Sequence, residues 1–464
     1  MSESTDKIIK NKINNIAKHD NNFWDFRKNS KRDYVHNLYS YPAMMVPKMI
    51  RELLNIVLVS QEKIDNILDP FCGAGTVLVE GMLKGKDVIG IDINPLSILI
   101  SKVKTQPLNM DILNKKISNL YTNIDKYING QETIDDITYF YKINKWFKKE
   151  VIYELEVIKQ SILKENNILY RRFFWVAFCQ TIHLVSNSRN STYKLHIKNE
   201  KDINEFSREP IREFKEVLSN NLEQMNEFMR ELDNRDLLEY NTSDIPKYSG
   251  SVDIIYGDVR KVLDDEFFRN RIDLMITSPP YGDNHTTITY GQFSVLQLRW
   301  LDMKDIFEEK WNDKKLVDTQ VEIDNRSLGG KSTKSNYSKY CKVLAESDFL
   351  QKIINKIIEK DENKKYKVVS FFNDFNESLE HIQSALKKNS YQIWVTGNRR
   401  VAKVKISLDT ILKELINKYE VEEIVDLYRT IPHKRIPNKN APKGQKGNYI
   451  KTIKKENILI FRKR

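Results

Sequence analysis

Apolar and polar positions follow one another along the chain in a pattern that predicts alternating helices and strands. The first cycle runs through a helix at 47–60, a strand at 66–70, a glycine turn at 73–75, a helix at 76–85, a strand at 87–93 and a helix at 95–104. Apolar residues recur at helical spacing in the first of these segments, and a glycine ends the second helix. Strands that alternate with helices favour a parallel, doubly wound sheet, so we predict an α/β fold.

The alternation stops near residue 106 and resumes near residue 250. The intervening segment is long, charged and mostly helical in pattern, with helices expected at 145–164 and 205–232. The α/β pattern then returns at 251–258 and 272–278 and, after a polar stretch, at 366–372, 391–398, 422–430 and 457–463. The predicted units are a polar N-terminal arm (1–33), expected to be loosely held, a first α/β part (34–105), a helical insertion (106–249), a second α/β part (250–301), a polar loop insertion (302–364) and a last α/β part with a basic C-terminal region (365–464).

Hydrophobicity and cysteine content restrict the class of protein. No apolar run approaches the ~20 residues of a membrane helix, and the polar first ten residues are unlike a signal peptide. Cys72, Cys179 and Cys341 are far apart and form no CxxC pair, which argues against a disulfide framework and a structural zinc site. We therefore expect a cytoplasmic protein without a metal or a membrane partner.

The positive charge is concentrated near the C-terminus. The chain has a formal net charge of +12, and residues 429–464 contain twelve Lys or Arg residues and one acid, Glu456. A cationic surface that faces phosphates would explain this distribution, because such charge drives polyanion binding. A solvated basic tail without a partner accounts for the count equally well, so charge alone leaves both interpretations open.

A glycine-rich loop with the sequence DPFCGAGT occupies residues 69–76, between a predicted strand and a predicted helix. Proteins with α/β folds bind nucleotides at this place, and Gly73 and Gly75 allow the backbone to approach a ligand closely. Leu78 stands where the dinucleotide fingerprint has its third glycine, and the Gly-Lys-Ser/Thr of a phosphate-binding loop is missing. A tight turn without a ligand remains the alternative for the loop taken alone.

Acidic residues near this loop change the expected ligand. Asp69 stands at the start of this loop and would disfavour a pyrophosphate, whereas it suits a cationic ligand. Asp92 ends the next strand, where its carboxylate can accept hydrogen bonds from ribose hydroxyls, and Asn94 follows it. This combination fits S-adenosylmethionine, which carries a sulfonium and an amino acid group, so we predict a site for that cofactor.

A second motif, SPPY, ends the predicted strand at 272–278. Proline lacks a backbone N–H and fixes φ, so Pro279 and Pro280 must end the sheet pairing at that point. They place Ser278 and Tyr281 on either side of a stiffened stretch of backbone. A Ser-Pro-Pro turn with a packing tyrosine is the alternative, but that interpretation does not account for the glycine loop upstream.

Together these motifs resemble those of the DNA amino-methyltransferases, and TYGQFSVLQLRWL, SLGG, VTGNRRV and HKRIPNKNAP resemble a restriction–modification subgroup. DPFCGAGT is similar to the cofactor motif, TSPPYGDN to the catalytic motif, HNLYSYPAMMVP to the segment beside the methionine end, and IIYGDV to the strand end at the adenine. The resemblance covers roughly residues 34–104 and 250–464 and implies a Rossmann-like S-adenosylmethionine methyltransferase sheet with a large helical insertion. It assigns cofactor contacts to Tyr41, Pro42, Asp69, Phe71, Gly73, Gly75, Thr76, Asp92, Ile93, Asn94, Asp258 and Ser278.

The implied reaction moves a methyl group from sulfur to an exocyclic amino nitrogen. That nitrogen is a poor nucleophile because its lone pair is delocalised into the ring. The Ser278 hydroxyl and the Pro279 carbonyl can each accept an amino hydrogen, and Pro280 helps to hold the carbonyl still. The target base must leave the duplex, and Tyr281 offers a flat face on which it can stack. We expect these four residues to form the catalytic motif.

The first residue of the catalytic motif bears on the substrate. Serine at position 278 leans toward cytosine N4 in this family, whereas aspartate leans toward adenine N6. We therefore predict a site-specific DNA cytosine-N4 methyltransferase, with DNA adenine N6 as the first alternative and guanine N2 of transfer RNA as the second. A nucleic-acid-binding subunit without catalysis is a further alternative, against which the intact motifs argue. C5 methylation needs a cysteine nucleophile after a proline, and none of the three cysteines has that setting.

DNA contacts are expected in the insertions and in the basic segments. The helical insertion, a candidate for target recognition, interleaves basic and aromatic residues in RRFFWVAFCQTIHLVSNSRN, although an amphipathic core helix explains its FFWVAF part equally well. The expected DNA contacts are Arg171, Arg172, Arg189, Lys194, His285, Tyr290, Lys331, Arg399, Arg400, Lys434, Arg435 and Lys439. The expected partners are double-stranded DNA and, in a functional sense, a cognate restriction endonuclease.

Overall fold

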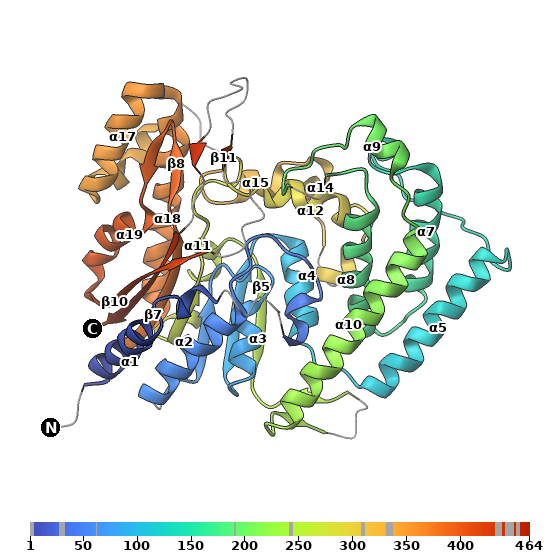
Figure 1. The fold of residues 1–464 in the computed structure, drawn as a ribbon, viewed down its shortest axis with the longest axis horizontal. Helices are drawn as coiled ribbons and strands as arrows, with labels where there is room; N and C mark the ends of the chain where they lie inside the picture. The colour runs from blue at the N-terminus through green and yellow to red at the C-terminus, as the bar shows by residue number, and fades with distance from the viewer. Residues whose placement is uncertain are drawn as a thin grey trace.

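A seven-stranded sheet forms the centre of the protein in the computed structural model (Figure 1). The structure describes residues 4–26, 33–61, 63–189, 192–240, 245–307, 311–330, 337–431, 439–440, 450–451 and 455–464, with the backbone alone for 439–440 and 450–451. The strands are β1 (Asn66–Asp69), β2 (Asp87–Asp92), β5 (Val252–Tyr256), β6 (Ile272–Thr277), β7 (Leu386–Gly397), β10 (Val421–Thr430) and β13 (Lys455–Lys463). Their spatial order is β10-β13-β7-β6-β1-β2-β5.

All strands of this sheet except β13 run in one direction. β1 pairs in parallel with β2 and β6, β2 with β5, and β6 with β7, whereas β13 pairs antiparallel with both β7 and β10. The chain moves outward from β1 to β5 and then returns to the other side of β1 with β6. The carboxyl ends of β1 and β6 therefore lie together where the winding reverses, which is where open α/β sheets bind ligands. The predicted doubly wound sheet is confirmed.

Side chains at successive positions of the central strands point into two separate cores. Ile67, Leu274 and Ile276 pack on one face of the sheet, whereas Leu68 and Met275 pack on the other, and all five are fully buried. Strand side chains alternate between faces, so a strand covered on both sides has to be apolar at successive positions. This explains the uninterrupted apolar runs that predicted these strands.

Helices cover both faces of the sheet. α1 (Thr5–His19), α2 (Pro47–Ser60), α3 (Thr76–Met82) and α4 (Pro95–Lys104) belong to the first core, and α11 (Val259–Val262), α17 (Asp348–Asp361), α18 (Lys365–Ala385) and α19 (Leu408–Ile416) to the second. Residues 366–372, which continue the α/β pattern, belong to α18 rather than to a strand. Val368, Phe372, Phe375 and Leu379 recur there at helical spacing and are all buried.

The chain between α4 and β5 is mainly helical and lies beside one edge of the sheet (Figure 1). Its helices are α5 (Met110–Ile128), α6 (Ile143–Trp146), α7 (Lys149–Leu163), α8 (Ile168–Val185), α9 (Glu200–Glu205) and α10 (Pro210–Asp233), and a short hairpin of β3 (Leu238–Glu239) and β4 (Lys247–Tyr248) follows. α8 contacts α4, α7 and α10, and its FFWVAF run (173–178) is completely buried. That run is therefore core, as the amphipathic-helix interpretation holds.

The N-terminal segment differs from the loosely held arm that its polar composition predicts. α1 is a helix of 15 residues, and its Ile9 and Ile13 are fully buried in the first core. Asp6 accepts hydrogen bonds from the Tyr391 hydroxyl at 2.5 Å and from Arg462 at 2.9 Å. Two isoleucines four positions apart lie on one helix face, so they dock a helix that is otherwise polar.

Short helices follow β6, the strand that leads into SPPY. They are α12 (Tyr290–Leu298), α13 (Lys304–Phe307), α14 (Lys315–Asp318), α15 (Glu322–Arg326) and α16 (Tyr337–Tyr340), and a hairpin of β8 (Arg399–Val401) and β9 (Val404–Ile406) follows β7. The described part of the expected polar loop insertion at 302–364 thus contains helices, and its last helix, α17, packs on α18 and α19. Across the described ranges, no helix combines the length and the apolar character that a bilayer crossing requires.

Candidate active site

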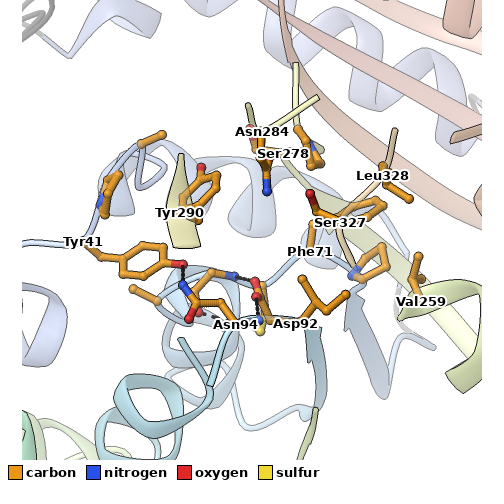
Figure 2. A pocket seen from close by; sticks show the side chains of 18 of the residues that line it. Tyr41, Phe71, Asp92, Asn94, Val259, Ser278, Asn284, Tyr290, Ser327 and Leu328 are labelled. Atoms are coloured by element: carbon orange, nitrogen blue, oxygen red, sulfur yellow. Dashed lines mark hydrogen bonds between the residues drawn. The ribbon is translucent and has the colours of Figure 1, made fainter. Parts of the chain in front are cut away.

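One pocket brings the glycine loop and the SPPY motif together at the carboxyl ends of the parallel strands (Figure 2). Its volume, including the open mouth, is about 920 Å³. The predicted cofactor residues that line it are Tyr41, Pro42, Phe71, Gly73, Thr76, Asp92, Ile93, Asn94, Asp258 and Ser278. The pocket therefore gathers residues from four strand ends, at the place where the winding of the sheet reverses.

Hydrogen bonds from the next strand and helix hold the glycine loop in place. The Gly73 N–H donates to Asp92 Oδ2 at 2.9 Å, and the Gly73 carbonyl accepts from the hydroxyls of Ser97 and, at 3.0 Å, Ser101. Gly75 precedes α3 with φ = 71°, a left-handed conformation that glycine adopts without a steric penalty. Gly75 does not line the pocket. A Cβ added at this position would come within 2.9 Å of the Ser101 hydroxyl. Its role is thus the shape of the loop.

Asp92 and Asn94 form one end of the pocket, at the end of β2 (Figure 2). Asp92 Oδ1 accepts a hydrogen bond from the Asn94 N–H at 2.8 Å. The Asn94 amide donates to the Tyr41 hydroxyl at 2.9 Å and to the Ser294 hydroxyl at 2.8 Å. Burial raises the pKa of the Asp92 carboxyl, so a cationic ligand beside it would stabilise its ionised form.

Aromatic and apolar side chains form two opposite walls. Tyr41 and Tyr290 stack with their ring centroids 5.7 Å apart on one side, and Phe71, Val259 and Leu328 lie on the other (Figure 2). A slot of this kind accepts a flat apolar group, and the carboxylates at its edges provide hydrogen-bond acceptors. The residues present therefore fit a ligand that carries a heteroaromatic ring, hydroxyls and a positive charge.

Asp258 reaches the pocket from the end of β5, where it caps α11. Its Oδ1 accepts the Arg260 N–H at 3.0 Å, and the Arg260 guanidinium binds both carboxylate oxygens. Arg260 also forms an ion pair with Asp374 at 3.0 Å. Asp258 thus lies where the sequence places it, but its charge is compensated by a neighbour on the same helix.

Asp69 lies behind the pocket wall and does not line the pocket. Its Oδ1 accepts hydrogen bonds from the Thr277 hydroxyl at 2.7 Å and from the Phe71 N–H at 3.2 Å, and the side chain is fully buried. Burial raises the pKa of this carboxyl to about 7. The expected direct contact between Asp69 and the cofactor is therefore corrected: Asp69 ties the end of β1 to the end of β6.

The SPPY motif leaves β6 at the pocket. Ser278 and Pro280 line it, while Pro279 is buried and Tyr281 is partly buried. The Tyr281 ring packs against Gly397 at the end of β7, where a Cβ would lie 2.2 Å from the ring. The Tyr281 hydroxyl is 3.3 Å from the Ser278 hydroxyl. Serine and tyrosine of the motif are thus in contact with each other.

Arg399 supports the turn after Tyr281 from inside the protein. Its guanidinium donates to Asp283 Oδ2 at 3.2 Å and to the Thr286 hydroxyl at 3.1 Å, and only 8% of the side chain is exposed. Gly282 has φ = 153°, and a Cβ there would overlap the guanidinium. Side chains alternate along β8, so Arg399 points inward and Arg400 outward. The expected contact between Arg399 and a DNA phosphate is corrected by this burial.

Arg171 and Arg172 are also engaged within the protein. Arg171 binds both carboxylate oxygens of Asp305 at 2.6 and 2.7 Å, and the buried Arg172 donates to the Asp305 carbonyl at 2.5 Å. The Trp175 indole donates to the same carboxylate at 2.6 Å. Their charges connect α8 to α13, which corrects the expectation that these two arginines contact DNA.

The other expected DNA contacts divide between exposed and internal positions. Arg189, Lys194 and Arg400 are exposed, His285 is partly exposed, and Tyr290 lines the pocket opposite Phe71. Lys331, Lys434 and Arg435 lie outside the described residues, as does the side chain of Lys439. No group of three or more His, Cys, Asp or Glu side chains suited to a metal ion occurs where the structure describes the chain.

Among the pocket residues that the sequence did not predict, four come from one segment. They are Ile323, Arg326, Ser327 and Leu328, in and just after α15. The last two belong to the SLGG stretch, which the sequence marks only by its resemblance to a restriction–modification subgroup. In the structure Ser327 and Leu328 line the pocket, and the Gly329 N–H donates to Asp374 at 2.8 Å.

The similarity of this chain to known proteins extends over nearly its whole length. Residues 2–103 match the family described as DNA methylase. The type II methyltransferase M.MvaI from Kocuria varians is 35% identical over 98% of this chain and 97% of its own. The type II methyltransferase M.AvaI from Nostoc sp. is 24% identical over 81% of this chain and 78% of its own. A tRNA (guanine(10)-N2)-dimethyltransferase from Methanocaldococcus jannaschii is 43% identical over 56 residues, which are 12% of this chain and 15% of its own.

Proposed function

The chain belongs to the type II DNA amino-methyltransferases, and from that membership we propose that it transfers a methyl group from S-adenosylmethionine to N4 of a cytosine in double-stranded DNA. The observation that carries this proposal is the shared pocket of the glycine loop and the SPPY motif. Gly73 and Ser278 come from strands that lie far apart in the sequence, yet both line one pocket. A cofactor held by the loop and a base held by Ser278 would therefore meet.

The residues around the glycine loop would hold the cofactor. Asp92 and Asp258 provide acceptors for hydroxyl and amino groups, and Phe71 and Val259 provide an apolar wall for a flat ring. The end of the pocket near Tyr41 is polar, because its hydroxyl and the Asn94 amide are fixed there by a hydrogen bond of 2.9 Å. S-Adenosylmethionine, when bound, supplies an electrophilic methyl group.

Ser278 and Pro279 would activate the amino group of the base. Each of the two amino hydrogens needs an acceptor, and the Ser278 hydroxyl and the Pro279 carbonyl are the two that the motif offers. Accepting both hydrogens localises the nitrogen lone pair and orients it for displacement. The two prolines restrict the backbone, so the acceptors need little reorganisation on the way to the transition state.

The base would reach this position by rotating out of the duplex. The partly buried Tyr281 ring lies beside Ser278 and packs against Gly397. Stacking on an aromatic ring contributes about 1–3 kcal/mol per base, which offsets part of the cost of unstacking. We assign Tyr281 this stacking role.

The loop that follows SPPY and contains Asp283 is called the catalytic loop below. Exposed cations flank it on two sides and would contact the DNA backbone. Arg189 and Lys194 follow α8, and the segment of Lys194 touches α12 through the hydrogen bond from the Leu195 N–H to Gln292. Arg400, Lys403 and Lys405 lie exposed on the β8–β9 hairpin, whose inward Arg399 binds the catalytic loop at Asp283. DNA that lies across the pocket would meet both groups of charges.

Serine at the first position of the motif favours cytosine N4 over adenine N6, which remains the second candidate. As a type II methyltransferase, the chain would protect the sites of a cognate restriction endonuclease, without a physical contact being required.

Nucleoside analysis tests this function directly. We expect DNA from cells that express the chain to contain N4-methylcytosine after hydrolysis and mass spectrometry, and DNA from cells with the Ser278→Ala variant to lack it. N6-methyladenine instead would select the second candidate. Methyl groups found only in RNA, or no methylated base at all from a protein that binds S-adenosylhomocysteine, would refute the proposed function.

A further inference from the structure

Three neighbouring strands place Arg429, Glu456 and Gly397 in one row across the sheet. Glu456 of β13 pairs with Gly397 of β7 on one side and with Arg429 of β10 on the other. Because Gly397 has no side chain, the Tyr281 ring occupies its place in the row. The Tyr281 hydroxyl thereby comes within 3.1 Å of Glu456 Oε1.

Arg429 fixes the other side of the Glu456 carboxylate. Its guanidinium donates to Glu456 Oε2 at 2.6 Å and to the Trp24 carbonyl at 2.9 Å, and the side chain is 3% exposed. A guanidinium has donors only, so the group that faces it must accept. In this ion pair Glu456 contributes a carboxylate, which has acceptors only.

These contacts determine where the hydroxyl protons point. The Tyr281 O–H donates to Glu456, because a carboxylate cannot donate. Burial and the charge of Glu456 raise the pKa of the Tyr281 hydroxyl, so it keeps this proton. Toward Ser278 the Tyr281 oxygen can then only accept, and the 3.3 Å contact becomes a hydrogen bond from Ser278 to Tyr281. The Ser278 proton is turned away from the pocket and its lone pairs remain there.

We propose that Glu456 is a positioning residue for methyl transfer, which acts through Tyr281 to keep Ser278 an acceptor toward the amino group of the base. The inference rests on the proposed function and names a residue outside the SPPY motif on which that function depends. A Ser278 proton directed at the base would compete with the amino hydrogen that the serine has to accept. The alternative is that Glu456 only neutralises Arg429 between two strands.

Replacing Glu456 by glutamine separates these two roles. Arg429 requires an oxygen, so the new amide would face Tyr281 with its NH₂ group, and both hydroxyls would reverse their direction. We expect Glu456→Gln to lower kcat at least about tenfold, as loss of one preorganised polar contact does. The KM for a DNA duplex and the affinity for S-adenosylhomocysteine should stay within about twofold, because Glu456 does not line the pocket and acts through Tyr281.

Tyr281→Phe provides a second, independent variant. It keeps the ring that packs on Gly397 and removes the hydroxyl that joins Glu456 to Ser278. If the two residues act through one path, the double variant should be no slower than the slower single variant, within about twofold. Glu423→Gln is the matched control, because it removes a carboxylate from β10 that pairs with Lys413 on the surface, and it should leave kcat unchanged.

The outcomes are distinct for this inference and for the proposed function. A wild-type protein that methylates no DNA amino group contradicts the function itself. If the wild type is active and Glu456→Gln has an unchanged kcat, the role of Glu456 is overturned. The same holds if the losses of kcat in the two single variants multiply in the double variant. If Glu456→Gln loses binding of S-adenosylhomocysteine, Glu456 is structural, and full kcat in Tyr281→Phe then overturns the path through the tyrosine as well.

Discussion

The Thr277 hydroxyl donates a hydrogen bond of 2.7 Å to the carboxyl of Asp69, across 208 positions of sequence. Thr277 is the last residue of the strand that leads into SPPY, and Asp69 is the last residue of the strand that leads into the glycine loop. The contact therefore joins the two motifs at their roots, where β1 and β6 run side by side. A shift of either strand end would change the distance between the cofactor loop and Ser278.

Asp69 should make stability depend on pH. Its pKa is raised by burial to about 7 from an ordinary value of 3.8, so the folded protein keeps a proton that the unfolded chain releases between these values. Stability therefore falls as the pH rises through this window and levels off above it. Asp69→Asn keeps the acceptor for Thr277 and cannot ionise. We expect its stability relative to wild type to rise by more than about 1 kcal/mol between pH 5 and pH 8 in urea unfolding. Parallel pH curves would contradict this.

Ser278→Ala should separate chemistry from cofactor binding. The substitution removes one of two acceptors for the amino hydrogens and leaves the Pro279 carbonyl in place. We expect kcat to fall about 10²- to 10³-fold, as after loss of one preorganised polar group in other active sites. Binding of S-adenosylhomocysteine, measured by calorimetry, should change little. An equal loss of affinity and turnover would show that Ser278 mainly shapes the cofactor pocket.

Gly397→Ala should reduce activity by moving Tyr281. A Cβ at position 397 would lie 2.2 Å from the Tyr281 ring, so the ring must leave its place between Ser278 and Glu456. We expect at least about a tenfold loss of kcat with a folded protein. Gly130→Ala serves as a control, since nothing lies within 4 Å of its Cβ and only its φ of 68° opposes the change. Full activity of Gly397→Ala would show that the tyrosine position is not critical.

The β8–β9 hairpin should contribute electrostatically to DNA binding. Arg400→Ala and Lys405→Ala each remove an exposed cation, and each should reduce the slope of log K against log salt by about one. The measurement is a salt titration of duplex affinity by fluorescence anisotropy. Lys10→Ala is the control, because it removes an exposed cation from α1, at the opposite end of the sheet (Figure 1). Equal slopes in all variants would remove the hairpin from the interface.

The strands and the glycine loop could be predicted because their signals are local. Leu274, Met275 and Ile276 are apolar in succession, and Pro279 ends the strand by its own chemistry. Glu456 and Gly397 could not be placed beside Tyr281, because that depends on the register of β13 against β7. The DNA contacts predicted for buried arginines were wrong for a related reason. A guanidinium is identical in sequence whether it faces a phosphate or Asp305.

Arg462 and Arg464 both donate to Asp6 of the first helix, at 2.9 and 2.8 Å, so the start of α1 and the end of β13 lie close together (Figure 1). Joining them with a short linker would close the backbone into a ring without disturbing the sheet. On such a ring, the glycine loop comes neither before nor after SPPY. The order of the two motifs in the chain then records where the ring was opened, and an enzyme opened in another surface loop would keep the same pocket with its motifs in reverse order.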